Sequence, residues 1–573
     1  MRALELTASI ADHPNRVLAD VVEEYARDFG ETPALISEKE SFTYAELAAR
    51  ANQYSRWALE QGLGKNDVVC LLMPNCPEYI AVWLGITRVG VVVALLNTNL
   101  TGSALGHCIN EVEASHVIAP EGLVARLDAA RPHLRRTAGI WTPESIQAGS
   151  HSRTTVRPDE SGMVTIEDRA LCIYTSGTTG LPKAANISHG RIMHWARWFQ
   201  GMIGVQSSDR MFNCLPMYHS VGGLVAPGAM LAAGASTVIA GKFSAQQYWG
   251  EIVRWRCTLL QYVGELCRYL VDQPPSAEES RHEIRMACGN GLAADVWERF
   301  QERFRIPRIF EFYAATEGGV SLFNIEGVPG SVGHVPPYLR HRFSPALVRF
   351  DSEREEPVRN KDGFCIRCAQ GETGEAIGKA YSGGRDFGSR FEGYTNRQAA
   401  KDKILKNVFE TGDLWVRTGD LMRQDERGFF YFVERTGDTF RWKGENVSTA
   451  EVARAIREYP GVRHVAVYGV SVPFADGRAG MAALVTDPAF DLKLFREHLA
   501  GRLPSYACPV FLRISETIEI TDTFKYQKTQ LVGAGYNPAG TTDRFYLNDR
   551  GLQAFVRVDN ELYERLRSGT VRL

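Results

Sequence analysis

Hydrophobic positions between residues 20 and 320 follow two alternating patterns, one with helical spacing and one of short continuous runs. The segment "FTYAELAARANQYSRWALEQG" (42–62) has helical spacing and begins beside Thr43, a residue type that caps helices. The run "DVVCLLM" (67–73) is typical of a buried strand. This alternation predicts a large α/β domain with mixed sheets and helices.

The most lipid-like segment, "YIAVWLGITRVGVVVALL" (79–96), fits the same alternation. It carries Arg88 near its middle and two glycines, so we predict a helix followed by a buried strand rather than a membrane span. The N-terminal residues lack the apolar core of a signal peptide, because Glu5 and Asp12 bracket a short mixed run. We therefore predict no transmembrane span, and peripheral contact with a membrane surface is left open.

From Asp402 onward the pattern changes to short strands joined by glycine turns, followed by further strands and helices. The predicted elements of this last part are a helix at 449–459, strands at 463–470 and 480–486, a helix at 492–502 and a strand at 511–515. They predict a smaller α+β domain of about 140 residues. We place it at 436–573, after a larger domain (1–435) that ends with a small β-barrel-like part.

Composition excludes some classes of function. The 573 residues include 44% hydrophobic and 23% charged residues, which is ordinary for a globular protein, and a net charge of −2 gives no reason to expect nucleic acid. The eleven cysteines are scattered and odd in number, which predicts a reducing, cytoplasmic location. Cys365 and Cys368 have CxxC spacing, but without a second pair or a nearby histidine we expect neither zinc nor redox chemistry there.

A glycine-rich loop carries the clearest candidate chemistry. In "YTSGTTGLPKAANISHGR" (174–191), small hydroxyl residues and glycines surround Lys183, directly after the strand pattern "ALCIY". Ser188 can then cap a helix. A glycine-rich turn between a strand and a helix lets backbone N–H groups converge on an anion, so we predict a phosphate site.

This loop is not a Walker A motif. Gly180 is followed by Leu-Pro-Lys-Ala, whereas the motif needs a glycine followed by lysine and a hydroxyl residue. No other stretch of the sequence supplies that motif, or a G-x-G-x-x-G between a strand and a helix. If the loop stood alone, a plain structural turn would be the alternative.

Six further blocks follow this loop in order, and together the seven resemble the signatures of adenylate-forming enzymes, the superfamily of acyl-CoA synthetases, aryl-CoA ligases, luciferases and peptide-synthetase adenylation domains. The further blocks are "LPMYHS" (215–220), "GNGL" (289–292), "EFYAATEG" (311–318), "TGD" (418–420), "ERTGDTFRWKGENVS" (434–448) and "TDTFKYQK" (521–528). Two of these blocks, together with "YVGELCRYL" (262–270), are similar to the long-chain and very-long-chain acyl-CoA synthetase branch, which includes the fatty acid transport proteins. The resemblance extends from about Val22 to Leu573.

The resemblance implies two half-reactions and three small molecules: ATP, Mg²⁺ and coenzyme A. A carboxylate attacks the α-phosphate to give an acyl-adenylate and pyrophosphate, and a thiol then attacks the adenylate's carbonyl. Residues implied to hold the outer phosphates are Thr175, Ser176, Gly177, Thr178, Thr179, Gly180 and Lys183. Thr316 would bind the α-phosphate, and Glu317 would be the metal ligand, since carboxylate oxygen suits Mg²⁺.

The nucleoside would lie against several further positions. Residues implied to bind adenine or ribose are Gly289, Asn290, Gly291, Tyr313, Asp420 and Arg435. The string T-G-D occurs three times, and we choose Asp420 because only it leads directly into the strands before Arg435, which leaves Asp413 structural. Ala314 and Gly319 stand where close relatives often have Gly and Asn, which puts the shape of the adenine pocket in doubt.

The smaller domain is expected to be mobile and to serve the two half-reactions in turn. Gly437 falls at the implied hinge, where glycine absorbs a backbone change cheaply, and Asp438 is the alternative pivot. Residues implied to meet coenzyme A after rotation are Arg441, Lys443 and Gly444, the alternative being solvated surface charges for the first two.

Two residues are implied to act at the carboxylate. Lys525 would bridge it to the α-phosphate and neutralise the charge that opposes attack, with Lys528 as the rival lysine. Asp522 stands where relatives usually have glycine, so the geometry of that loop is open. His219 would line the acyl entrance, with a purely structural histidine as the alternative. It is not expected to be a general base, because a thiol needs little help to ionise.

The sequence therefore predicts an ATP-dependent acyl-CoA synthetase acting on a long-chain fatty or fatty-like acid. The alternatives left open are a ligase for bile, steroid or aryl acids, an acyl-AMP ligase that loads a carrier protein, and a fatty-acid binding or uptake protein without catalysis. The expected tunnel wall lies in 219–236 and 262–270. The expected partners are the acid and coenzyme A, and homodimer formation is left open.

Overall fold

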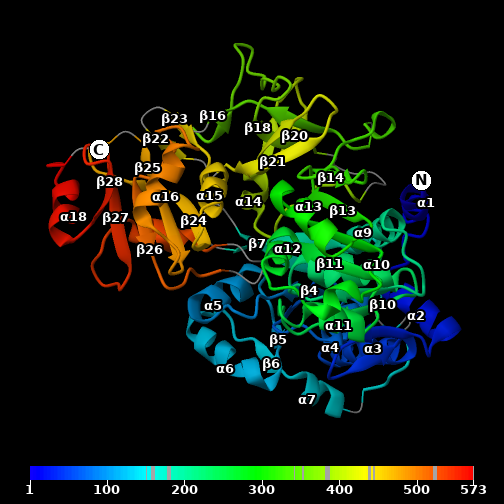
Figure 1. Ribbon diagram of the computed structural model, residues 1–573. Helices are drawn as coiled ribbons and strands as arrows, with labels where there is room; N and C mark the ends of the chain where they lie inside the picture. The colour runs from blue at the N-terminus through cyan, green and yellow to red at the C-terminus, as the bar shows by residue number, and fades with distance from the viewer. Residues whose placement is uncertain are drawn as a thin grey trace. The chain divides into compact units, whose positions relative to one another are not determined.

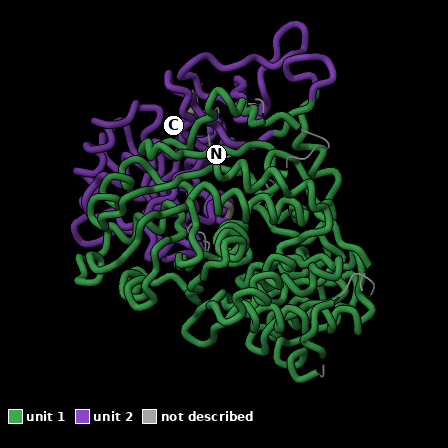
Figure 2. Tube along the Cα trace, turned by 90° about the vertical axis from the view of Figure 1, so that its right-hand side faces the viewer, with its two compact units in different colours: residues 1–345, 378–406, 414–416 green, residues 346–377, 407–413, 417–573 purple. Residues whose placement is uncertain are grey.

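The computed structural model divides the chain into two compact units (Figure 2). It describes residues 1–149, 151–156, 160, 162–176, 182–340, 342–351, 354–380, 387–436, 440–442, 445–475, 477–520, 526–571 and 573, with the backbone alone at 176, 441, 445, 446 and 529. The first unit comprises Met1–Pro345, Gly378–Lys406 and Leu414–Val416, and the second Ala346–Ile377, Asn407–Asp413 and Arg417–Leu573. The domain boundary predicted at residue 435 stays a prediction.

A mixed sheet of eight strands forms the centre of the first unit. Its order is β14-β13-β12-β11-β9-β10-β1-β2, parallel from β13 to β1 with antiparallel strands at both edges. The strands are β1 (Pro33–Ile36), β2 (Ser41–Thr43), β9 (Arg210–Asn213), β10 (Ser236–Ile239), β11 (Leu259–Val263), β12 (Met286–Asn290), β13 (Ile309–Ala314) and β14 (Ser321–Asn324). Because the inner strands are nearly continuous apolar runs, both faces of the sheet are buried.

A second sheet of the same unit has six strands in the order β6-β5-β3-β4-β7-β8. The strands are β3 (Val68–Leu71), β4 (Val92–Leu95), β5 (His116–Ile118), β6 (Gly139–Trp141), β7 (Arg169–Ser176) and β8 (Pro182–Ser188). They are parallel except for the last pair, β7 and β8, which form an antiparallel hairpin. This hairpin is the element that positions the predicted phosphate loop.

Helices lie around both sheets (Figure 1). Those of the first unit are α1 (Arg2–Ala8), α2 (Leu18–Phe29), α3 (Tyr44–Glu60), α4 (Pro77–Arg88), α5 (Gly102–Glu111), α6 (Glu121–Ala130), α7 (Pro143–Ala148), α9 (His189–Met202), α10 (Ala226–Leu231), α11 (Tyr248–Arg254), α12 (Gly264–Val271), α13 (Ala294–Arg303) and α14 (Arg397–Asp402). The cap predicted at Thr43 is confirmed, since its side chain accepts a hydrogen bond from the Glu46 N–H. The lipid-like segment forms α4 and β4, as predicted.

A small sheet of five strands has the order β15-β18-β20-β19, with β21 paired to β20. The strands are β15 (Pro345–Val348), β18 (Gly374–Lys379), β19 (Ile404–Lys406), β20 (Leu414–Gln424) and β21 (Phe430–Arg435). This sheet matches the predicted β-barrel-like part. A short antiparallel pair is formed by β16 (Phe350–Asp351) and β17 (Glu356–Pro357).

The last part of the second unit has its own hydrophobic core. A sheet in the order β24-β25-β26-β27-β28 is contacted by α15, α16 and α17. Its elements are α15 (Thr449–Arg457), β24 (Val462–Ser471), β25 (Arg478–Thr486), α16 (Leu492–Ala500), β26 (Phe511–Ile514), α17 (Lys528–Ala534), β27 (Arg544–Asp549), β28 (Ala554–Arg557) and α18 (Asn560–Arg567). The predicted α+β arrangement is confirmed, and the four elements after β26 were not predicted.

Candidate active site

The phosphate loop joins two strands of a hairpin, which corrects the predicted passage from strand directly to helix. Thr175 pairs with Lys183 and Ser176 pairs with Pro182 across β7 and β8, so the two ends of the loop are held by paired strands. The predicted loop residues Gly177, Thr178, Thr179 and Gly180 lie outside the described residues. Residues 182–188 form a strand because they pair with β7, and the helix begins only after Ser188, whose hydroxyl accepts from the Arg191 N–H as predicted.

The predicted metal ligand Glu317 lies in the tight connection between β13 and β14. Its side chain is buried, with 7% of the residue exposed. The Tyr394 hydroxyl donates to Glu317 Oε1 over 2.5 Å, and Lys403 Nζ lies 3.7 Å from the same oxygen. Thr316 Oγ1 lies 3.5 Å from Ser220 Oγ. A buried carboxylate can hold Mg²⁺ together with substrate phosphates, and Tyr394 orients Glu317 through a hydrogen bond to one of its oxygens.

The buried carboxylate of Glu392 links the β13–β14 connection to Ser188, at the end of the hairpin formed by β7 and β8. Its two oxygens accept from the Ser188 N–H (2.7 Å) and the Ser188 hydroxyl (2.6 Å), and Arg191 Nε lies 3.4 Å away. The Glu392 N–H in turn donates to the Glu317 carbonyl over 3.1 Å. Burial lowers the pKa of the Arg191 guanidinium, while the charge of Glu392 opposes that shift. We call Ser188, Arg191 and Glu392 the hairpin brace.

Glycine is required at position 318, where the β13–β14 connection lies against Arg191 of the hairpin brace. Gly318 has φ +96°, and an added Cβ would lie 2.2 Å from the Arg390 carbonyl oxygen and 2.7 Å from a guanidinium nitrogen of Arg191. A side chain at this position would therefore clash with both and strain the backbone.

The predicted adenine turn follows β12. Gly289 and Asn290 end the strand, and Gly291 has φ +81°. Asn290 Oδ1 is buried and, within the described part of the chain, has no hydrogen-bond partner, so a ligand amino group could use it. Tyr313 is half-buried near the end of the neighbouring strand β13. The structure thus brings these predicted residues to the ends of two adjacent parallel strands, where ligands bind in open α/β sheets.

The backbone of the adenine turn is held by Glu311 of β13, a buried acid that the motif analysis did not single out. Glu311 Oε1 accepts from the N–H groups of Gly291 and Leu292, and Oε2 accepts from the Tyr262 hydroxyl over 2.5 Å. The sequence did contain a signal, because one acid stands among apolar residues in "IFEFY" (309–313).

His219 is half-buried beside Tyr218, with 4.6 Å between the ring centroids. It precedes a π-helical turn, η2 (Val221–Val225), a type of irregularity often found at functional sites. The turn packs closely, since an added Cβ at Gly223 would lie 1.9 Å from the Met217 carbonyl oxygen.

In the second unit, the predicted ribose residues lie together. Asp420 and Arg435 are partners across β20 and β21, and Arg435 Nε lies 3.4 Å from Asp420 Oδ1. Asp413 is buried and accepts from the N–H groups of Val408 (2.5 Å) and Phe409 (3.0 Å), as a structural aspartate should. The T-G-D strings that end at Asp413 and Asp420 are therefore separated by their surroundings as well as by their place in the sequence.

Several remaining predicted residues lie outside the described residues. These are the hinge candidates Gly437 and Asp438, the coenzyme A candidates Lys443 and Gly444, and the adenylation lysine Lys525. Arg441 lies in β22 (Phe440–Trp442). Only the backbone of Arg441 is described. The rival Lys528 donates to the Thr449 hydroxyl over 3.3 Å.

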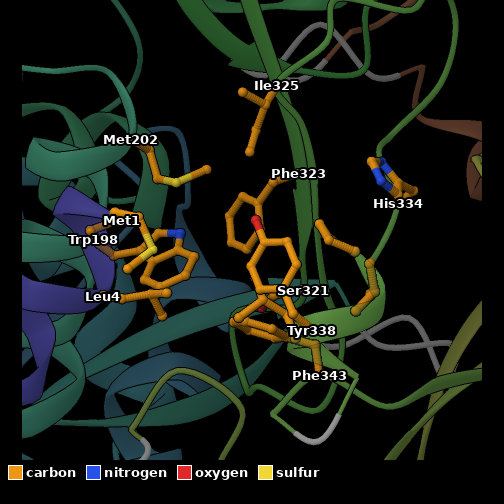
Figure 3. Close-up of a pocket in the computed structure, with 14 residues that line it drawn as sticks. Met1, Leu4, Trp198, Met202, Ser321, Phe323, Ile325, His334, Tyr338 and Phe343 are labelled. Atoms are coloured by element: carbon orange, nitrogen blue, oxygen red, sulfur yellow. The ribbon is translucent and has the colours of Figure 1, made fainter.

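An apolar pocket of the first unit lies beside β14 (Figure 3). Met1, Leu4, Trp198 and Met202 are seen on one side of it and Phe323, Tyr338 and Phe343 on the other. The complete lining is Met1, Ala3, Leu4, Trp198, Met202, Ser321, Phe323, Ile325, His334, Val335, Pro336, Tyr338, Leu339 and Phe343. It differs from the segments predicted as tunnel wall, 219–236 and 262–270, whose role stays a prediction.

Among the described residues, no helix is both long and apolar enough to cross a bilayer, and no cluster of three or more potential metal ligands occurs. Cys365 and Cys368 are both free thiols, with their pKa values raised by burial.

Comparison with known proteins agrees with this architecture. The family model described as AMP-binding enzyme matches residues 22–359, and the model of the AMP-binding enzyme C-terminal domain matches residues 451–525. The chain therefore belongs to the AMP-binding enzyme family, the adenylate-forming class that the motifs resemble.

Within that family, the chain is similar to long-chain fatty acid transport proteins. It is 38% identical to long-chain fatty acid transport protein 6 of Mus musculus, covering 94% of this chain and 88% of the relative. It is 40% identical to long-chain fatty acid transport protein 3 of Homo sapiens, covering 89% and 76%.

Solved structures share the fold at lower identity. ATP-bound MatB from Rhodopseudomonas palustris has a TM-score of 0.74 at 24% identity, covering 90% of this chain and 98% of that one. The Mycobacterium tuberculosis fatty acyl CoA synthetase has a TM-score of 0.64 at 24% identity, also covering 90% and 98%.

Proposed function

We propose that the protein is an ATP-dependent acyl-CoA synthetase that activates long-chain fatty acids through an acyl-adenylate. The acid's carboxylate attacks the α-phosphorus of ATP, and the bond to pyrophosphate breaks. The thiol of coenzyme A then attacks the acyl carbon and displaces AMP. Similarity to fatty acid transport proteins over most of the chain and to a fatty acyl CoA synthetase fold supports this substrate class.

The observation that carries the proposal is the hairpin brace. It ties the start of α9, at the base of the phosphate hairpin, to the backbone of Glu317 through one buried carboxylate. A phosphate-binding loop and a metal-ligating acid must keep a fixed separation if both are to act on one triphosphate. Mg²⁺, held at Glu317, would neutralise phosphate charge.

The chain's own groups divide the remaining work. The hairpin tip would bind the outer phosphates with Lys183, and Thr316 would donate to the α-phosphate. Asn290 Oδ1, a buried acceptor, would accept a hydrogen bond from the adenine amino group. Asp420 would bind the ribose hydroxyls beside Arg435, and Lys525 would reach the attacking carboxylate.

The pocket beside β14 would take the alkyl chain. Ser321 in its lining is four residues after Glu317, so their Cα atoms are at most about 14 Å apart. Trp198, Phe323 and Phe343 give it an aromatic interior, with ring centroids 5.3 Å and 5.6 Å from Trp198. Burial of methylene groups against such walls favours longer chains by about 0.8 kcal/mol each.

The direct test is a substrate panel. Fatty, aryl and steroid acids are supplied with ATP, Mg²⁺ and coenzyme A, and AMP release is measured for each. We expect the highest kcat/KM with long-chain fatty acids. A higher kcat/KM with bulky ring acids would favour the bile, steroid or aryl alternative. AMP release only when an acyl carrier protein replaces coenzyme A would favour the carrier-loading alternative. No AMP release with either acceptor would favour a binding protein without catalysis.

Narrowing the pocket should shorten the accepted chain. Ser321→Phe places a bulky side chain in the lining beside Phe323. We expect kcat/KM for a sixteen-carbon acid to fall about tenfold relative to an eight-carbon acid. Excluding part of the longer alkyl chain from an apolar pocket costs roughly 1–3 kcal/mol of transition-state binding energy. Ser280→Phe on the exposed turn η3 (Ala277–Ser280) is the matched control and should leave the ratio unchanged. An unchanged ratio in Ser321→Phe would mean that the alkyl chain of the substrate binds outside the pocket beside β14.

A further inference from the structure

Glu311 is a buried acid whose hydrogen bonds all lead to the adenine turn or its support. Only 1% of the residue is exposed. Three donors converge on it: the backbone N–H groups of Gly291 and Leu292, and the Tyr262 hydroxyl of β11. Among the described residues, no lysine, arginine or histidine forms an ion pair with it. The carboxyl is therefore held by neutral donors alone, which is uncommon for a buried acid.

The turn has no freedom to shift without disturbing these bonds. An added Cβ at Gly264 would lie 1.7 Å from the Gly291 carbonyl oxygen, and one at Gly289 would lie 2.3 Å from the Tyr262 carbonyl oxygen. The backbone of the turn thus packs directly on the end of β11. If the Glu311 carboxyl were lost, the N–H groups of Gly291 and Leu292 and the Tyr262 hydroxyl would all lose their acceptor.

We infer that Glu311 is a positioning residue for nucleotide binding, which fixes the Gly289–Leu292 turn in the conformation that receives adenine. The inference rests on the proposed function. Glu311 does not itself contact the nucleotide in this arrangement. Its effect passes through the backbone of Gly291 and Leu292, to which it is hydrogen-bonded.

The protonation state follows from the surroundings. Burial raises the pKa of Glu311 to about 8, although the hydrogen bonds from Tyr262, Leu292 and Gly291 oppose the shift. The titratable groups facing it are Tyr262, Cys267 of α12 and Cys288 of β12, and burial raises the pKa of each as well. None of them ionises before Glu311 as the pH rises.

The arginines of the adjoining helices α12 and α13 pair with other carboxylates. Arg268 lies 3.0 Å from Asp295, Arg299 lies 3.3 Å from Asp272 and Arg303 lies 2.9 Å from Glu279. Above about pH 8 the carboxyl ionises and leaves a buried charge without a counter-charge beneath the adenine turn, which should disturb the turn and weaken nucleotide binding.

The same raised pKa predicts a pH dependence of stability. Between the ordinary value of 4.5 and about 8, the folded state binds one proton more than the unfolded state. The free energy of unfolding therefore falls as the pH rises through this window. We expect Glu311→Gln, which keeps a neutral side chain of the same shape, to remove this part of the fall in chemical denaturation at pH 5, 6.5 and 8.

The inference is tested by the affinity for a non-hydrolysable ATP analogue, measured by calorimetry from pH 6.5 to 9.5 without coenzyme A. In the wild type we expect Kd to rise above about pH 8. In Glu311→Gln we expect a wild-type Kd at pH 7 and no such rise, since the amide cannot ionise. In Glu311→Ala we expect Kd to be about tenfold or more higher at every pH, and in Tyr262→Phe a smaller increase.

Different failures have different meanings. If the wild type binds the analogue but Glu311→Gln shows the same pH profile, or Glu311→Ala shows an unchanged Kd, the positioning role is wrong and the proposed function stands. If Glu311→Ala does not fold, the Gln and Phe variants still decide between the outcomes. If the wild type binds no nucleotide, the proposed function fails and the inference falls with it.

Discussion

Lys525→Ala should abolish acid-dependent exchange between ATP and pyrophosphate while the protein still converts supplied acyl-adenylate to acyl-CoA. The attacking carboxylate and the α-phosphate are both negative, and a lysine that bridges them lowers the barrier to their approach. Loss of such a preorganised charge costs about 10²–10³ in rate. The second half-reaction begins after pyrophosphate has left, so it does not need this lysine.

Lys528→Ala is the matched control for this prediction. Lys528 lies three residues later, and its Nζ donates to the Thr449 hydroxyl in the described part of the second unit. Its removal should cost little in either half-reaction. Equal loss of both half-reactions in Lys525→Ala would contradict its assignment to adenylation, and a selective loss of exchange in Lys528→Ala would transfer that assignment to Lys528.

Local patterns predicted the elements of the fold well. The helix capped by Thr43, the helix and strand within 79–96, and the α+β order after residue 449 were all predicted from spacing and turn residues, and all are present. These features depend on neighbours within a few residues, so one segment of sequence contains the necessary information.

The strand β8 was not predicted, because its conformation depends on pairing with another strand. Its sequence, "PKAANIS", has small residues instead of the β-branched run that marks a strand, and pairing with β7 decides its conformation. Tertiary pairing therefore overrode a weak local preference. The motif analysis still located the loop, because its hydroxyl and glycine residues are adjacent in sequence.

The residues that support the candidate site lay beyond motif analysis. Glu392 is 204 residues from Ser188, and Tyr394 is 77 residues from Glu317. No periodicity connects positions so far apart, and each of these side chains alone is ordinary. Their roles follow only from the contacts that the fold creates.

Glu392→Ala should be strongly destabilising as well as inactivating. The exposed fractions of the Arg191 and Glu392 side chains are 1% and 5%, so this pair is buried. Removing the carboxylate leaves a buried guanidinium without its counter-charge, and breaking a buried pair in this way costs about 3–5 kcal/mol. The hydroxyl and N–H of Ser188 lose their acceptor as well.

The exposed pair of Arg390 and Glu167 provides the matched control. It has a shorter distance, 2.5 Å, but its side chains are 27% and 57% exposed. Glu167→Ala should therefore cost no more than about 1 kcal/mol, because solvent screens an exposed pair. The free energy of unfolding from urea titration measures both variants.

A double variant separates the charge from the space that it fills. Arg191→Met with Glu392→Leu replaces the buried pair by apolar groups of similar size, and such replacements are often neutral or better in stability. We expect it to be more stable than Glu392→Ala alone yet to remain poor in ATP–pyrophosphate exchange, because no acceptor then holds Ser188. Recovery of both properties would show that the brace only fills space, whereas recovery of stability alone would show that the carboxylate sets the geometry between the phosphate hairpin and Glu317.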